Sequence, residues 1–290
     1  MTEIVQASLP FAPWADPRTR RLPGILPMPA DEWLQIDDAF AAQMAERDRL
    51  IAIRPDAVHA LAERGRPAAE ELYDRLLAEL VRMPGYRVGA RSVTRPDGVE
   101  DALDRGAPLL TLGRLVQEDL CLLEQAEGEP EHVLTGAVLC FPSNWTLAEK
   151  FLRPLIRIHV PVASYDDDVA RRVQRLFDAI RPEQGLWRAN AGHCGDAILF
   201  RPRREADPPR RDRGPDMPYI RSERQTLIRL PQTRAVVFGI HTYVVRQTSL
   251  TAEQAAALAA FPLHGGSGTE EAQMRGHQVH LRAENGAAEG

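Results

Sequence analysis

From about Leu109 onward the chain is built from short runs rich in apolar and β-branched residues, and their spacing is the strongest constraint on its fold. Seven such runs follow one another: PLLTLGRLV, VQEDLCLLE, HVLTGAVLCF, LIRIHV, AILF, YIRSERQTLIRL and AVVFGIHTYVV. One helical pattern interrupts them, at residues 166–180, where apolar residues recur on one side. Neighbouring parallel strands need a crossover of a dozen or more residues between them. The spacing therefore predicts a mainly antiparallel sheet and an α+β fold.

The N-terminal third has a different pattern, a proline-rich stretch followed by helices. The stretch LPFAPWADPRTRRLPGILPMP is expected to wrap over the body as an arm. Asp31 can cap a helix that runs to about Arg49, and Pro67 opens a second helix whose apolar residues recur at intervals of three and four. We therefore expect residues 1–105 to form an arm and helices packed on a body made by residues 106–261.

Three further segments of the C-terminal half are predicted to form a loop, a helix and a tail. Residues 201–218 are dense in charge and proline, which predicts an exposed loop. Thr251 followed by Gln254 fits a capping box for a last helix, TAEQAAALAAF. Residues 262–290 offer little apolar surface to bury, so we expect them to be a disordered tail on one structural unit.

Composition narrows the class of protein. Apolar residues make up 44% of the 290 residues, enough for a substantial core, and the net charge of −5 comes from acidic and basic residues mixed along the chain. No face is predicted to bind nucleic acid, and no stretch of apolar residues is long enough to span a membrane, so we expect a cytoplasmic protein. The three cysteines lie far apart, which favours reduced, buried thiols over disulfides or a structural zinc site.

The 36 basic residues include a single lysine, Lys150, in the segment FPSNWTLAEK. An ammonium differs from a guanidinium in size and hydration, so this lysine could serve a purpose that arginine cannot. Two interpretations remain open: it anchors a carboxylate of a cofactor, or it pairs with Glu118 or Asp119 in VQEDLCLLE. Burial of those two carboxylates favours a structural ion pair. Trp145 in the same segment fits either a core position or a platform for a ligand.

Two strand-like segments place polar side chains among apolar ones. In LIRIHVPV, strand alternation predicts His159 on one face with Arg157, either as a core histidine or as a ligand of haem iron. In YIRSERQTLIRL, alternation predicts Arg224 on the more apolar face, where its guanidinium needs a planar anion from the sheet or from a cofactor. In AVVFGIHTYVV, His241 fits a core residue, a ligand or an acid/base group.

Common catalytic motifs do not occur in the sequence. It contains no GxGxxG after a strand, no GxxxxGK[ST], no HExxH and no GxSxG. Dinucleotide, nucleoside triphosphate, zincin and serine hydrolase chemistry therefore have no support.

Four motifs, in order and spacing, resemble the haem-dependent oxidative N-demethylase family: VQEDLCLLE, LCFPSNWTLAEK, RIHVPV and RSERQTLIRLPQTRAVVFGIHTY. The resemblance extends over residues 9–261 and includes the opening segments LPFAPW and GILPMPADEWLQID. It implies a PAS-like antiparallel sheet in residues 106–261 that binds haem b. It also implies oxidation of a small methylated amine, dimethylamine or a similar compound, with dioxygen as oxidant and formaldehyde as a product. Electrons from NAD(P)H would come through a separate flavin or iron–sulfur reductase.

The same resemblance implies roles for individual residues. His159 would be the proximal iron ligand, with Lys150, Arg224 and Arg229 as partners of the haem propionates. Trp145 would lie beside the cofactor, and Glu223 would hold the cationic amine. His241 is a candidate acid/base group on its own chemistry, which the resemblance does not imply. A PAS-like haem or small-molecule sensor without turnover is the alternative.

Two positions depart from the family pattern. Ala191 follows Arg188 and Asn190 where the family has tryptophan, in the pattern RxNW, and His241 stands where an arginine or lysine is commoner. If these positions line the haem pocket, the substrate, the ligands or the activity would differ from those of dimethylamine-type enzymes.

Overall fold

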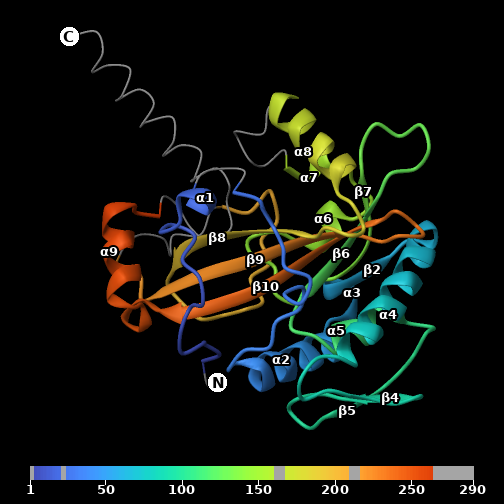
Figure 1. Cartoon of the computed structure of the whole chain (residues 1–290), viewed down its shortest axis with the longest axis horizontal. Helices are drawn as coiled ribbons and strands as arrows, with labels where there is room; N and C mark the ends of the chain where they lie inside the picture. Colours follow the sequence, from blue (N-terminus) through green and yellow to red (C-terminus); the bar gives the residue numbers. More distant parts are fainter. Residues whose placement is uncertain (1–2, 21–23, 160–166, 209–215, 264–290) are drawn as a thin grey trace.

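The computed structural model describes residues 3–20, 24–159, 167–208 and 216–263, and within them the dominant feature is one antiparallel sheet of seven strands (Figure 1). Its strands, in spatial order, are β1 (Leu26–Pro27), β8 (Leu186–Cys194), β9 (Tyr219–Arg229), β10 (Val236–Arg246), β6 (Asp119–Glu124), β7 (Val133–Val138) and β2 (His59–Leu61). A smaller sheet contains β3 (Arg87–Val88), β4 (Ser92–Thr94) and β5 (Glu100–Ala102). The predicted α+β class with a mainly antiparallel sheet is confirmed.

The centre of the large sheet is the β9–β10 hairpin, in which each strand has eleven residues. Its register pairs Glu223 with Thr242 and Arg224 with His241. Because successive side chains in a strand point to opposite faces, neighbouring residues of one strand are separated by the whole sheet. Glu223 and Arg224 therefore lie on different faces.

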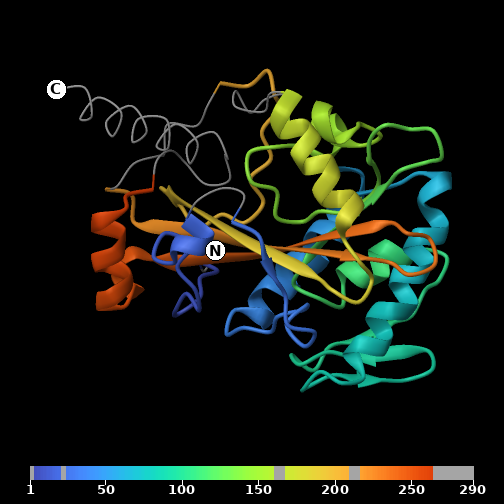
Figure 2. The same ribbon diagram turned by 45° about the horizontal axis from the view of Figure 1, so that its top comes forward.

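Helices cover both faces (Figures 1 and 2). One face packs against α2 (Phe40–Ile53), α4 (Arg66–Leu80) and α5 (Pro108–Gly113), with α3 (Pro55–Val58) following α2 and a 3-10 turn η1 (Glu63–Gly65) preceding α4. The opposite face packs against α6 (Leu147–Lys150), α7 (Leu155–His159) and α8 (Asp167–Ala179). We call these the α2/α4 face and the α8 face.

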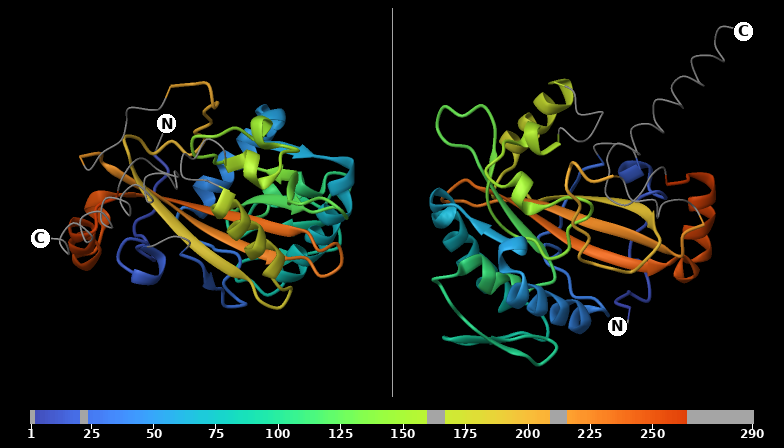
Figure 3. Two further views of the ribbon diagram at one scale, coloured as in Figure 1. Left: turned by 90° about the horizontal axis from the view of Figure 1, so that it is seen from above. Right: turned by 180° about the vertical axis from the view of Figure 1, so that it is seen from behind.

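The N-terminal residues lie at one end of the long strands, near α1 (Pro17–Arg20) and α9 (Ala252–Ala260), which follows η2 (Gln247–Ser249) (Figure 3). The backbone N–H of Gln6 donates to the carbonyl of Val244, and the indole of Trp14 donates to the carbonyl of Gln254. The side chains of Thr251 and Gln254 form the predicted capping box at the start of α9.

Several predicted elements differ from those observed. The helix expected from Asp31 begins at Phe40. The backbone N–H groups of Gln35 and Asp37 donate instead to the side chains of Glu118 and Gln117, which directly precede β6. The run PLLTLGRLV forms α5 instead of a strand, and LIRIH forms α7 instead of a strand. Both helices follow or include a proline near their start, a position that proline favours. The run AILF has no strand.

Other predictions agree with the structure. The apolar stripe of α4 is buried, and the helix predicted at residues 166–180 is α8. All three cysteines are buried, and none forms a disulfide within the described residues. Residues 202–208, the described part of the predicted loop after Arg201, have no helix or strand, although Arg201 itself is buried. Most of the predicted tail lies outside the described residues. Within the described segments, no helix has both the length and the apolar character to cross a membrane.

Candidate functional site

A row of polar side chains crosses the three central strands on the α8 face. Asn190 on β8 is paired with Glu223 on β9, and Glu223 is paired with Thr242 on β10. All three residues are buried. Directly opposed residues in a sheet place their side chains within contact of one another. We call these three residues the polar row.

Glu223 is the charged member of the polar row and is only 6% exposed. Its Oε2 atom accepts hydrogen bonds from the amide of Asn190 at 3.3 Å and from the amide of Gln225 at 3.0 Å. Its backbone N–H donates to the side-chain oxygen of Asn190 at 3.2 Å, so this asparagine fixes both the strand and the carboxylate. Among the described residues, the Oε1 atom has only a distant contact, at 3.8 Å, with Nε of Arg221. One carboxylate oxygen is thus held, and the other is left for a further donor.

Thr242 contributes an unusual atom to the polar row. Its side chain is 1% exposed, and among the described residues its hydroxyl oxygen Oγ1 has no hydrogen-bond partner. A buried hydroxyl without a partner is unfavourable. Such an atom beside a carboxylate indicates a place where a polar ligand group or a water molecule is expected.

Apart from charged and amide side chains such as Arg221, Gln225 and Arg229, the α8 face beside the polar row is apolar. Its buried cluster combines residues of the central strands with residues of α6, α7, α8 and the segments beside them: Cys121, Leu123, Leu134, Ala137, Leu139, Leu147, Leu155, Phe177, Ile180, Leu227, Val236 and Ile240. Trp145, Phe151 and Ile158 are partly buried against it. A polar row bordered by such a cluster has the character of a small-molecule site, in which a few placed polar groups interrupt an apolar wall.

Lys150 and Trp145 lie together beside this cluster. The ammonium of Lys150 is 5.3 Å from the centre of the Trp145 ring and donates to the carbonyl of Ile158 at 2.6 Å. That carbonyl belongs to the peptide bond that joins Ile158 to His159, the last residue of α7. Lys150 therefore holds the backbone directly before His159, whose side chain lies outside the described part of the structure.

The acidic residues of VQEDLCLLE have other partners than Lys150, so the expected pairing of Lys150 with Glu118 or Asp119 is wrong. Asp119 forms a buried ion pair with Arg47 at 2.7 Å, and it also accepts from the backbone N–H groups of Cys140 and Phe141. This confirms the structural ion pair predicted for that segment. Asp119 thereby ties α2 to β6 and to the segment after β7.

Arg229 is buried at the end of β9, where it meets α8. Its guanidinium donates to the carbonyls of Phe177, Ile180 and Arg234. Burial lowers the pKa of Arg229, and the neighbouring Arg234 charge acts in the same direction. These bonds fasten the C-terminal end of α8 to the hairpin. A contact between Arg229 and a haem propionate stays a prediction.

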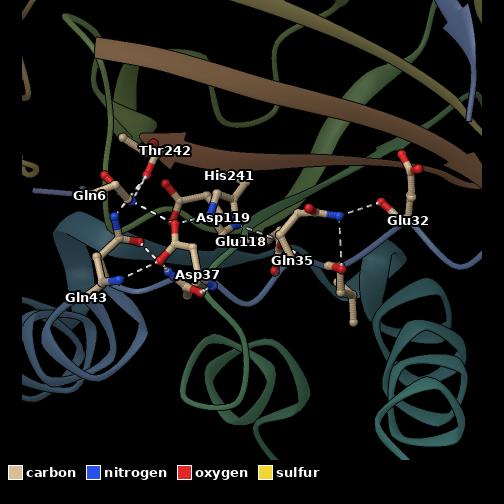
Figure 4. Close-up of polar contacts among 12 residues, drawn as sticks. Gln6, Glu32, Gln35, Asp37, Gln43, Glu118, Asp119, His241 and Thr242 are labelled. Carbon is tan, nitrogen blue, oxygen red and sulfur yellow. Dashed lines mark hydrogen bonds and ion pairs between the residues drawn. The ribbon is translucent and has the colours of Figure 1, made fainter. Parts of the chain in front are cut away.

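The α2/α4 face carries a second polar cluster, centred on His241 (Figure 4). Nδ1 of His241 is 3.0 Å from Oε1 of Glu118, and Nε2 is 3.0 Å from Oδ2 of Asp37. Burial alone would lower the pKa of this 1% exposed imidazole, but the hydrogen bonds and charges of the two carboxylates outweigh burial and raise the pKa to about 9. His241 is therefore a buried imidazolium. We call Asp37, His241 and Glu118 the histidine clamp.

Arg224 lies next to the clamp, paired in register with His241. Its guanidinium stacks over the ring of Trp187 at 5.4 Å, and its nearest carboxylate contact is with Glu32 at 3.6 Å. Burial lowers the pKa of Arg224, partly offset by the charge of Glu118. The predicted apolar setting of Arg224 is confirmed, because Trp187 and Tyr243 share its face.

The two polar clusters are joined through the backbone of Thr242. Its carbonyl accepts from the side-chain amide of Gln43 at 2.9 Å and from that of Gln6 at 3.3 Å (Figure 4). Gln6 also donates to Asp37 at 2.8 Å. The hydrogen bonds around the histidine clamp thus hold the backbone of Thr242, and the side chain of Thr242 belongs to the polar row on the other face.

The sheet therefore divides the residues predicted for one site. Glu223 and Arg229 lie on the α8 face, with Lys150 and Trp145 in the segments that cover it, whereas Arg224 and His241 lie on the α2/α4 face. Ala191 also lies on the α2/α4 face, packed with Leu9 and Trp14. Both departures from the family pattern are consequently on the face opposite Glu223.

Sequence reasoning missed Asn190 and Thr242 as neighbours of Glu223, and Asp37 as a partner of His241. Strand alternation tells which side chains of one strand share a face. It does not tell which residue of β10 lies opposite Glu223, because that register depends on the hairpin turn, in which Arg234 has a φ of 64°. No local signal could have found Asp37, which is 204 residues from His241.

A family model described as "Haem-dependent oxidative N-demethylase, alpha subunit-like" matches residues 24–267, well over half of the chain.

Proposed function

The chain belongs to the haem-dependent oxidative N-demethylase, alpha subunit-like family, and from this premise we propose that it oxidises a small methylated amine and releases formaldehyde. The proposed substrate is similar to dimethylamine, and the proposed oxidant is dioxygen. Electrons would come from NAD(P)H through a separate flavin or iron–sulfur reductase. The observation that carries the proposal is Glu223, a buried carboxylate in the sheet whose Oε1 atom has no partner at hydrogen-bond distance among the described residues.

The residues of the α8 face fit a haem. A porphyrin needs extended apolar contacts, which the cluster around Leu227 and Ile240 offers, and its propionates need cations at the edge. Lys150 lies beside α7, and that helix ends at His159, the proposed iron ligand. The hydroxyl of Thr242 is further support, because it is buried and has no hydrogen-bond partner among the described residues. When bound, the haem would supply the redox chemistry with dioxygen.

Glu223 is proposed to bind the ammonium group of the substrate. A methylated amine is protonated near neutral pH, and a buried carboxylate pairs with such a cation through a charge-assisted hydrogen bond. Asn190 and Gln225 occupy Oε2 and so direct Oε1 toward the ligand. The small size of the amine leaves few other groups by which it could be positioned.

The apolar surroundings serve two purposes in this proposal. They keep bulk water from the amine, which strengthens its electrostatic contact with Glu223. They also leave the methyl groups among apolar side chains, so that the N–H groups alone find polar partners. Orientation of the substrate then follows from the polar row.

The proposal is tested with purified protein expressed with a haem precursor. We expect a Soret absorption band, loss or displacement of that band in His159→Ala, and formaldehyde release from dimethylamine with oxygen and an electron donor. Glu223→Gln should keep the Soret band and weaken amine binding by about tenfold or more, because a charged hydrogen-bond partner becomes neutral. A protein without haem would contradict the proposal. Haem without formaldehyde from a panel of methylamines would instead indicate a sensor or binding protein.

A further inference from the structure

We propose that the hydroxyl of Thr242 is the second hydrogen-bonding group for the amine, so that Glu223 and Thr242 together bind the two N–H groups of a dialkylammonium ion. The inference rests on the proposed function, since it assigns a partner within the same site. It makes Thr242 a residue that determines specificity by the number of N–H donors on the substrate.

The first argument is geometric. Thr242 and Glu223 are directly opposed in the β9–β10 ladder and point to the same face. In the described part of the chain, Oγ1 of Thr242 has no hydrogen-bond partner, and Oε1 of Glu223 has only the 3.8 Å contact with Arg221. Two neighbouring acceptors in one buried row are therefore left without donors.

The second argument is chemical. A dialkylammonium ion carries two N–H groups that point away from its two carbon substituents, whereas a trialkylammonium ion carries one. A carboxylate oxygen and a hydroxyl oxygen can each accept one N–H. The polar row therefore matches a secondary amine in the number of its acceptors, and a tertiary amine would leave one acceptor unsatisfied.

The third argument is that the backbone of Thr242 is held on the opposite face. Gln43 and Gln6 both donate to its carbonyl, and Gln6 is in turn tied to Asp37 of the histidine clamp. A binding hydroxyl must be held in place to contribute to affinity, and these bonds fix its strand without occupying its side chain. The backbone of Thr242 is thus held by hydrogen bonds, while its hydroxyl has no hydrogen-bond partner among the described residues.

The test is isothermal titration calorimetry of the haem-loaded protein with dimethylammonium chloride and with trimethylammonium chloride. Thr242→Val removes the hydroxyl with little change in shape. We expect it to weaken binding of dimethylammonium by about tenfold, which corresponds to about 1.4 kcal/mol. Binding of trimethylammonium, which can satisfy its single N–H at Glu223, should change less than threefold. Thr242→Ser should restore most of the affinity for dimethylammonium.

Thr226→Val is the matched control. Thr226 is also a buried threonine, and its Oγ1 likewise has no partner among the described residues, but it lies on β9 and faces the α2/α4 side. We expect this variant to bind both amines as the wild type does. Thermal unfolding of each variant shows whether the fold is retained, and Thr242→Val is expected to unfold no lower than the wild type because it removes an unsatisfied buried hydroxyl.

The outcomes separate this inference from the proposed function. If the wild type binds dimethylammonium and Thr242→Val binds it equally well, the inference is wrong and the proposed function stands. If Thr242→Val weakens both amines to the same extent, Thr242 acts on the site only through the fold, and the inference is again wrong. If the wild type binds neither amine, the proposed function fails, and the inference fails with it.

Discussion

The proton on His241 should make the stability of the protein depend on pH in the alkaline range. The imidazolium lies between Asp37 and Glu118, at 3.0 Å from each, and His241 is only 1% exposed to water. Raising the pH removes the proton and leaves the buried carboxylate of Glu118 and the partly buried carboxylate of Asp37 facing a neutral ring. The experiment therefore changes the pH and compares the wild type with His241→Gln, whose side chain has no proton to lose in this range.

The magnitude follows from the pKa. The ordinary value is 6.5 and the value in the folded protein is about 9, and each unit of difference is worth about 1.4 kcal/mol, so the clamp contributes about 3 kcal/mol. Because the folded pKa is raised, this contribution is fully present below pH 6.5 and is lost as the pH rises through about 9. Asp37 acts in the opposite range, since burial would raise its pKa but the bond to His241 lowers it below 3.8. Its contribution is lost only in acid.

The assay is urea unfolding at about pH 6 and about pH 9.5, followed by tryptophan fluorescence. We expect the wild type to lose about 3 kcal/mol more than His241→Gln between the two conditions, since all other titrating groups are common to both proteins. His59→Gln is the control: burial lowers the pKa of His59, so its removal should leave the alkaline loss intact. Equal losses in the wild type and in His241→Gln would refute the reasoning.

Two other substitutions test neighbouring features. Arg47→Met leaves Asp119 buried without its cation and should lower the free energy of unfolding by about 3–5 kcal/mol in urea titrations; a loss below about 1 kcal/mol would show that the two backbone N–H groups suffice for the carboxylate. Lys150→Arg replaces a compact ammonium at the carbonyl of Ile158 with a planar guanidinium, and we expect it to weaken haem retention, measured by transfer to apomyoglobin, by about tenfold. Normal retention would mean that the lone lysine serves only as a charge.

The long elements α4, β9 and β10 could be predicted from the sequence, whereas β8 was not among the predicted runs because its residues Leu186–Cys194 include no β-branched residue. The apolar stripe of α4 and the alternation of β9 and β10 repeat over many residues, so they report which face is buried. The acidic segment around Asp119 was predicted to need a cation, and Arg47 meets it. Short apolar runs were not resolved in this way. The runs that form α5 and α7 are compatible with either a strand or a helix, and tertiary packing chose the helix.

The candidate site was predicted only in part. Glu223 was named through the family resemblance, as the group that would hold the amine, and that role stays a prediction. Asn190 and Thr242 lie in recognised motifs, but no motif indicates that they are neighbours of Glu223, because the register between the strands decides that. Arg224 and His241 were grouped with Glu223 in one site, yet strand alternation places them on the opposite face.

The sequence by itself determined the α+β class, the antiparallel hairpin spacing and the family. The reason is that periodicity and the order of motifs can be read along the chain without knowledge of the fold. Only the tertiary structure decided which polar groups meet. Asp37 reaches His241 across 204 residues, and Asn190 reaches Glu223 across 33. Register and packing bring such groups together, and both arise from burial of the whole sheet between two layers of helices. No single segment of the chain specifies that arrangement.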